Sequence, residues 1–183
     1  MTREDLIRLL SERFRENFAD ETARAVLGAD AVELLYDLVA SRSGELPKSV
    51  RHKVLFRGAY VLERICFTRP ERFMPRAEEF CRRDFAVCAD ASARRHFGKI
   101  MADLLGHYDP EPGALERIAG AAAEWAVDPG AKVAVKVWAV EVLKCCRNRV
   151  GWVAESWDDI VEAVTADATP GLACRLRKSW RRI

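Results

Sequence analysis

Residues 94–104 read RRHFGKIMADL, and residues 133–143 read VAVKVWAVEVL. Apolar positions in both stretches recur at intervals of three and four residues, which is typical of one face of an amphipathic helix. In the first copy this face is Phe97, Ile100, Met101 and Leu104. Adding 42 to each of these numbers gives Ala139, Val142, Leu143 and Cys146. The two stretches therefore predict equivalent helices in a repeating structure.

The helix that follows each stretch repeats at the same interval. Its apolar positions are Leu115, Ile118, Ala119 and Ala122, and the same addition gives Trp157, Ile160, Val161 and Val164. A shared interval for two successive helices indicates a helix pair that recurs about every 40 residues. One such pair cannot cover its own apolar stripe, so we expect neighbouring pairs to stack against each other.

Helical periodicity extends over nearly the whole chain, and no segment shows the alternation of a strand. We expect a single domain over residues 1–183, with less regular helices over 1–46 and repeats over 47–183. Thr2 followed by Asp5 predicts a capping box at the first helix. The repeat helices are expected at about residues 48–66, 73–88, 90–107, 114–127, 131–147, 152–166 and 171–183. Ser156 offers an internal start in the sixth, and the last is expected to cap the stack.

These patterns resemble a known family of repeats. FRGAYVLE at residues 56–63 and the two stretches quoted above look like first helices of HEAT-like repeats. Over residues 48–183 the chain is similar to HEAT and armadillo-type proteins, including small bacterial HEAT-like proteins. The resemblance implies an all-α fold, namely an α-α superhelix or solenoid of stacked helical hairpins. The motifs that carry it are packing patterns, so it implies no catalytic residues.

The composition excludes several classes of protein. Half of the 183 residues are apolar and 32% are charged, which argues against intrinsic disorder. No apolar run approaches the roughly 20 residues that span a bilayer, so no membrane association is expected. The first residues include Glu4 and Asp5 where a signal peptide would be basic and then apolar, which argues against secretion.

Six cysteines and three histidines fall into no metal-binding spacing, and no motif for a cofactor is present. The cysteines stand among apolar neighbours, so we expect reduced and mostly buried thiols in a cytoplasmic protein. The five tryptophans are expected to fill gaps between helices. We therefore expect no metal, no cofactor and no enzymatic activity.

Basic residues also follow the repeat, although the formal net charge is only +2. His52, Arg94 and Lys136 are spaced by 42 in the numbering, and Arg177 follows Lys136 by 41. Such a row could track a phosphate backbone, or it could be the solvated face of amphipathic helices. The end of the chain adds a cluster around Trp180, consisting of Arg175, Arg177, Lys178, Arg181 and Arg182. This cluster could grip nucleic acid or an acidic protein, or form the polar outer face of a capping helix.

These features predict a noncatalytic scaffold that binds a protein or peptide through the concave face of the stack. The alternative is nucleic-acid binding in the manner of the HEAT-like alkylpurine DNA glycosylases. The resemblance to those enzymes implies a cationic surface with an essential carboxylate and aromatic side chains. That catalytic set has no residue-by-residue match in this sequence.

Overall fold

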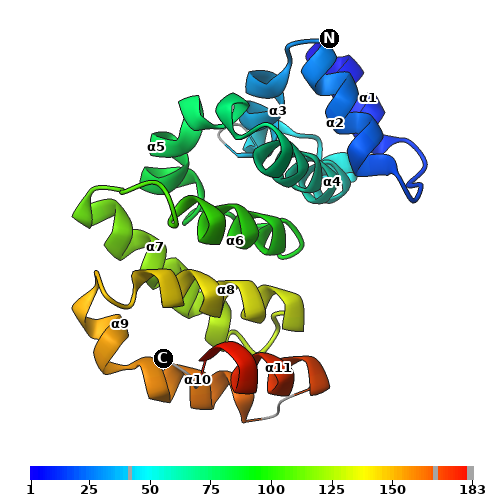
Figure 1. Ribbon diagram of the computed structural model, residues 1–183. Coiled ribbons are helices and arrows are strands. Elements are labelled where there is room, and N and C mark those ends of the chain that lie inside the picture. The colour runs from blue at the N-terminus through cyan, green and yellow to red at the C-terminus, as the bar shows by residue number, and fades with distance from the viewer. Residues whose placement is uncertain (41–42, 167–168, 181–183) are drawn as a thin grey trace.

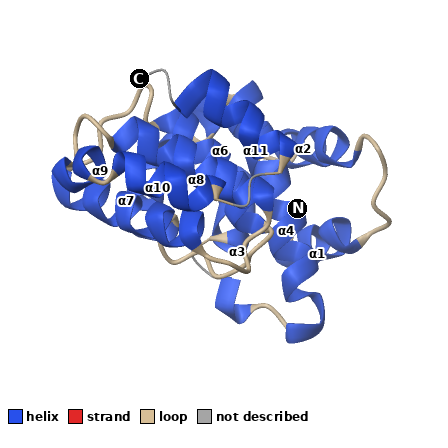
Figure 2. Ribbon diagram, turned by 90° about the horizontal axis from the view of Figure 1, so that it is seen from below, coloured by secondary structure: helices blue, strands red, loops and turns tan. Residues whose placement is uncertain are grey.

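A computed structural model describes residues 1–40, 43–166 and 169–180. Within these ranges every regular element is helical, and Figure 2 shows only helices and loops. None of the described helices combines the length and apolar character that a bilayer span requires. The buried apolar side chains of these ranges form one contiguous cluster that reaches from Leu6 to Trp180.

The first three helices are α1 (Arg3–Ser11), α2 (Phe18–Gly28) and α3 (Val32–Val39). The predicted capping box is confirmed, since the Thr2 hydroxyl accepts from the backbone of Asp5 and the Asp5 carboxylate accepts from the backbone of Thr2. All three helices pack against α4 (Lys48–Thr68), which follows the short 3-10 turn η1 (Ser43–Glu45). The amino-terminal helices therefore share the core of the rest of the chain.

Two rows of helices make up the remainder of the molecule (Figure 1). In one row α4 packs on α6 (Ala93–Leu104), α6 packs on α8 (Val133–Cys146), and α8 packs on α11 (Pro170–Arg175). In the other row the π-helical segment η4 (Phe80–Asp84) packs on α7 (Pro112–Val127), and α7 packs on α10 (Trp157–Thr165). Helices α7 and α8 also contact each other, which joins the two rows.

Three predicted helices are interrupted. The described part of the last, predicted over 171–183, consists of α11 and the π-helical segment η5 (Leu176–Trp180). The segment predicted as a helix over residues 73–88 follows the 3-10 turn η2 (Pro70–Arg72) and contains a second 3-10 turn, η3 (Met74–Arg76), before α5 (Ala77–Glu79) and η4. Pro70 and Pro75 lack the backbone donor that a continuous α-helix needs. The segment predicted over 152–166 is divided into α9 (Gly151–Glu155) and α10, and the expected internal start at Ser156 is confirmed as the N-cap of α10.

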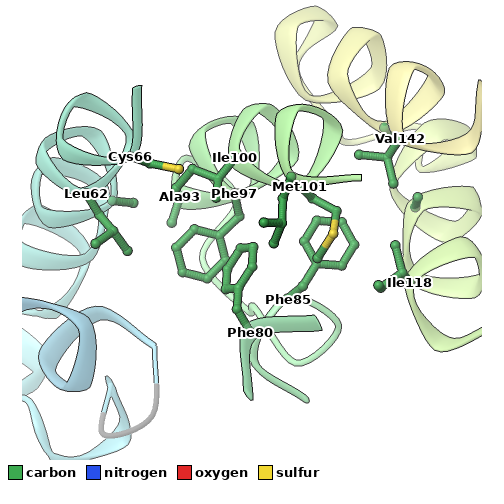
Figure 3. Close-up of a cluster of buried hydrophobic side chains, with 14 of the residues drawn as sticks. Leu62, Cys66, Phe80, Phe85, Ala93, Phe97, Ile100, Met101, Ile118 and Val142 are labelled. Atoms are coloured by element: carbon green, nitrogen blue, oxygen red, sulfur yellow. The ribbon is translucent and has the colours of Figure 1, made fainter. Parts of the chain in front are cut away.

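The core lies between the two rows (Figure 3). Phe97, Ile100 and Met101 of α6 are buried at the centre of the close-up. Phe80 and Phe85 from the second row reach toward them, and the Phe80 and Phe97 rings meet edge to face with centroids 5.1 Å apart. The apolar face predicted for residues 97–104 is therefore the face that is buried.

Two glycines allow close helix packing, one between α4 and α3 and the other between α6 and α8. A Cβ at Gly58 of α4 would overlap Cγ1 of Val39, and a Cβ at Gly98 of α6 would lie 2.9 Å from Cβ of Trp138. Neither position leaves room for a methyl group. The interval between contacting residues also varies along the first row. Glu63 pairs with Lys99, 36 residues later, whereas Cys145 donates to the carbonyl of Ala102, 43 residues earlier.

Candidate binding surface

The joint between α4 and α6 contains a buried polar cluster. Glu63 and His96 are both buried, with side chains 7% and 3% exposed, and His96 Nδ1 lies 2.5 Å from Glu63 Oε2. Lys99 Nζ donates to the other carboxylate oxygen at 2.7 Å. The His96 ring also stacks on Tyr60 with centroids 5.0 Å apart. We call Glu63, His96 and Lys99 the polar joint.

Burial raises the pKa of the Glu63 carboxyl, but hydrogen bonds from His96 and Lys99 outweigh it, so its pKa lies below the ordinary value. The second ring nitrogen of His96, Nε2, is buried and has no hydrogen-bond partner among the described residues. A carboxylate–imidazole pair is one part of many acid–base sites, but substrate must be able to reach the base. Because both side chains are buried, the polar joint is a packing element rather than a reaction site.

At the joint between α6 and α8, Trp138 packs closely against the backbone of α6 at Gly98, which has no side chain to prevent the approach. Lys99 and Arg175 place cationic groups 5.6 and 5.7 Å from the centroid of the Trp138 ring. Arg175 also donates to Glu141 at 3.2 Å, and the Trp180 indole donates to the same oxygen at 3.2 Å. The predicted role of tryptophans as fillers between helices fits this geometry. We call Gly98 with Trp138 the aromatic joint.

A cleft of about 810 Å³ opens where α4 and α6 end. Phe67 is 45% exposed beside it, although it is a large apolar side chain. Met74 supplies further apolar wall, while Asp103 and Glu71 supply carboxylates. Glu71 is paired with Arg69, but Asp103 has no ion partner among the described residues. Helix carboxyl ends add partial negative charge here, so the carboxyl-end cleft is apolar and electronegative.

A second cavity, of about 280 Å³, lies at the opposite ends of the same helices. Its lining comes from the second and third turns of α4, from the first turns of α6 and α8, and from the residues just before α6 and α8: His52, Phe56, Ala91, Ser92, Arg95, Lys132, Ala134 and Val135. We call it the amino-end cavity. The positive ends of α6 and α8 therefore meet at this cavity, whereas the negative ends of α4 and α6 meet at the cleft.

The structure separates the predicted basic row. His52 lines the amino-end cavity, and its Nδ1 lies 2.7 Å from Oδ2 of Asp90. Arg94 faces the second row instead, where its Nε donates to the Cys88 carbonyl at 2.9 Å and its guanidinium lies over the Trp125 ring. Lys136 is half-exposed in α8, next to the cavity wall. The three side chains therefore do not form one continuous track.

The carboxy-terminal candidates are divided as well. Arg175 is exposed but engaged with Glu141 and Trp138, and Lys178 is exposed in the π-helical segment η5 (Leu176–Trp180). The side chain of Arg177 and all of Arg181 and Arg182 lie outside the described residues. Trp180 itself is buried, with its indole bonded to Glu141. Trp180 is thus part of the packing of this end.

The cysteine thiols are poorly suited to nucleophilic chemistry. Burial, with smaller contributions from nearby Asp103 and Glu63, raises the pKa of Cys66 to about 12; Cys66 lines the carboxyl-end cleft. Burial likewise raises the pKa of Cys81 to about 12 and that of Cys146 to about 12. These thiols are therefore protonated near neutral pH, and a protonated thiol is a weak nucleophile. The six cysteines of the described part of the chain are all free thiols.

The sequence patterns predicted neither the carboxyl-end cleft nor the position of Lys132 in the lining of the amino-end cavity. Phe67 follows the apolar pair Ile65 and Cys66, so its periodicity gave no sign that it is exposed. Arg95 adjoins Arg94 in the sequence but is not part of the predicted basic row. Lys132 and Arg95 lie near helix starts, where a cation is unfavourable because the helix dipole is positive there. This unfavourable placement is the sequence signal that could have singled them out.

Comparisons with known proteins add no family to this description. No protein-family model matches the chain, and neither a curated protein nor a solved structure matches it. The described residues also contain no group of three or more His, Cys, Asp and Glu side chains that could hold a metal ion. The surface features above are therefore the basis for a functional proposal.

Proposed function

We propose that this protein is a noncatalytic binding module, built as a HEAT- or armadillo-like solenoid, that captures a segment of a partner protein. The serial contacts from α4 to α6, α8 and α11, and from η4 to α7 and α10, support the solenoid arrangement. In such a stack each pair contacts its neighbours, and the helix ends line up along two edges. These edges present extended surfaces for recognition.

The exposure of Phe67 beside the carboxyl-end cleft is the observation that carries the proposal. A fully buried phenylalanine stabilises a fold by about 1.5–3 kcal/mol relative to an exposed one, so the partial exposure of Phe67 reduces its contribution to stability. The adjacent cleft of about 810 Å³ is in the range of small-molecule and side-chain binding sites. An aromatic side chain at the centre of a contact is typical of a binding hot spot.

The surroundings of Phe67 define the partner segment. Met74 and Phe67 offer apolar contact, and the carboxylate of Asp103 lies on the same cleft without an ion partner among the described residues. The carboxyl ends of α4 and α6 favour positive charge at this place. The cleft therefore suits an apolar side chain next to a lysine or arginine in the partner.

Affinity capture with matched variants tests the proposal. The chain is immobilised and exposed to lysate of its own source, and bound proteins are compared for wild type, Phe67→Ser and Val87→Ser. Val87 is 62% exposed on the loop between η4 and α6, so it serves as a control at a more exposed apolar side chain. We expect a partner retained by wild type and Val87→Ser and lost with Phe67→Ser.

Two results would contradict the proposal. One is equal recovery of every bound protein by the Phe67→Ser and Val87→Ser variants. The other is retention of nucleic acid alone, lost after nuclease treatment. Circular dichroism of both variants checks that they keep the wild-type helical content, which is expected because both side chains are exposed.

A further inference from the structure

The amino-end cavity combines an apolar interior with cations that have no partner. Phe56 and Val135 supply apolar surface, and Arg95 and Lys132 supply positive charge. Both cationic side chains are exposed, and neither has an ion pair or hydrogen bond among the described residues. Most other arginines of the described chain are engaged with carboxylates, carbonyls or aromatic rings, as Arg64 is with Asp20.

The backbone adds unused donors at the same place. The first N–H groups of any helix have no acceptor within the helix. At α6 the Asp90 carboxylate accepts from the backbone of Ser92 at 3.0 Å and of Ala93 at 2.8 Å. At α8 no side chain caps the start, and Ala134 of its first turn lies in the cavity wall, although the Val135 N–H already donates to the Lys132 carbonyl at 2.8 Å. The uncapped start of α8 therefore leaves donors for an anionic group.

We infer that the amino-end cavity binds an acidic peptide segment in which carboxylates flank an apolar side chain. The apolar side chain would contact Phe56 and Val135, and the carboxylates would pair with Arg95, Lys132 and the start of α8. This assigns a second recognition site to the molecule, beyond the cleft at Phe67. The site does not depend on the proposed function, because it shares no residue with the cleft.

The surrounding charges favour an acidic peptide over a nucleic acid. Binding to a phosphate backbone needs a continuous track of cations, because each phosphate that a cation neutralises releases counterions and so adds to the binding free energy. Here the cations of the cavity give way to Glu63, Asp103 and Glu141 farther along α4, α6 and α8. His52 is already paired with Asp90. The positive charge is thus local and matches a few carboxylates.

Fluorescence anisotropy with a defined probe tests the inference. The probe is a short fluorescein-labelled peptide in which glutamates flank a central leucine and phenylalanine, and its control carries glutamine in place of glutamate. The protein variants are Arg95→Gln with Lys132→Gln, and the charge-matched control Arg24→Gln with Arg82→Gln. Arg24 and Arg82 are exposed and lie on α2 and η4, outside the cavity.

We expect the acidic probe to bind wild type and the Arg24/Arg82 variant equally. Loss of two exposed charge pairs should weaken its affinity for the Arg95/Lys132 variant by about tenfold. The glutamine peptide should show the same weakening with wild type. Binding should also weaken as salt rises from about 0.01 to about 1 M, over which the screening length falls from about 30 to about 3 Å.

Three outcomes would overturn the inference. These are no binding of the acidic probe, equal weakening in the Arg95/Lys132 and Arg24/Arg82 variants, and tighter binding of an oligothymidine whose affinity depends on Arg95 and Lys132. The last would assign the cavity to nucleic acid. A Phe67→Ser variant is measured in parallel, and we expect it to bind the acidic probe like wild type.

Discussion

The two joints of the first row hold adjacent helices together by different means. Between α4 and α6 the contact is a buried carboxylate with His96 and Lys99, whereas between α6 and α8 it is Trp138 against Gly98. The first joint depends on protonation and on complete hydrogen bonding. The second depends on shape. One row of helices therefore accommodates a hydrogen-bonded ionic contact and a mainly steric one.

Removing the imidazole from the polar joint should have the largest effect. In His96→Ala the buried Glu63 carboxylate loses one of its two partners, and Tyr60 and Phe56 lose a stacked ring. Leaving a buried polar group without its partner costs about 1–3 kcal/mol, and more when the group is charged, so we expect a loss of about 3 kcal/mol. Urea unfolding measures the loss. His107→Ala, at an exposed histidine, should change the free energy of unfolding by less than about 0.5 kcal/mol; equal losses in the two variants would contradict the account of this joint.

Adding one methyl group to the aromatic joint should have the next largest effect. In Gly98→Ala the new Cβ would lie 2.9 Å from Cβ of Trp138, so α6 and α8 must separate. Overpacking of this kind costs about 1–3 kcal/mol. The matched control is Gly120→Ala in α7, where a Cβ meets nothing within 4 Å. That variant should gain about 0.5–1 kcal/mol, since alanine favours a helix. If Gly98→Ala proved as stable as Gly120→Ala, the close approach would be wrong.

The two joints should also differ in their response to acid. The folded-state pKa of Glu63 lies below its ordinary value of 4.5, so its contribution to stability is complete above that pH and is lost as pH falls. The free energy of unfolding should therefore fall less steeply below pH 4.5 in Glu63→Gln than in wild type. Gly98→Ala should keep the wild-type slope. Parallel slopes for wild type and Glu63→Gln would show that the carboxylate is not held by His96 and Lys99.

Lys99 belongs to both joints, and its coupling to the aromatic joint should be the smallest effect. Its ammonium group lies 5.6 Å from the centroid of the Trp138 ring and 2.7 Å from Oε1 of Glu63. A double-mutant cycle with Lys99→Met and Trp138→Leu should give a coupling free energy of about 0.5–1 kcal/mol, the usual size of a cation–π contact at a partly exposed site. A coupling of zero would mean that the two joints are energetically independent.

Helices with strong periodicity could be predicted from the sequence within a few residues. The apolar faces of α6 and α8 repeat cleanly, and both are helices with those faces buried. The segment after α4 could not be predicted as well, because Pro70 and Pro75 break it locally while Phe80 and Phe85 are held by the core. An amphipathic pattern reports the buried face but not where tertiary contacts override helix continuity.

The candidate site shows a sharper limit. Arg94 and Arg95 are adjacent, yet Arg94 lies over Trp125 and Arg95 lines the amino-end cavity. Adjacent helix positions point about 100° apart, so a small error in the register of two helices moves a side chain to another face. A uniform interval places Arg94 opposite His52, whereas the contact observed for His52 is with Asp90, 38 residues away. The sequence could therefore predict positive charge at the amino ends of the first-row helices, but not which residue places it in the cavity.

Site-directed photo-crosslinking at Phe67 is the most direct measurement of the central claim, that the exposed edge of the helix row captures a partner segment. A benzophenone-bearing phenylalanine analogue is placed at position 67 or, as control, at position 87, in the full chain inside its own cells. The account predicts a discrete crosslinked protein from position 67 that is absent from position 87 and is reduced by Asp103→Asn. Identical adduct patterns from the two positions would contradict it.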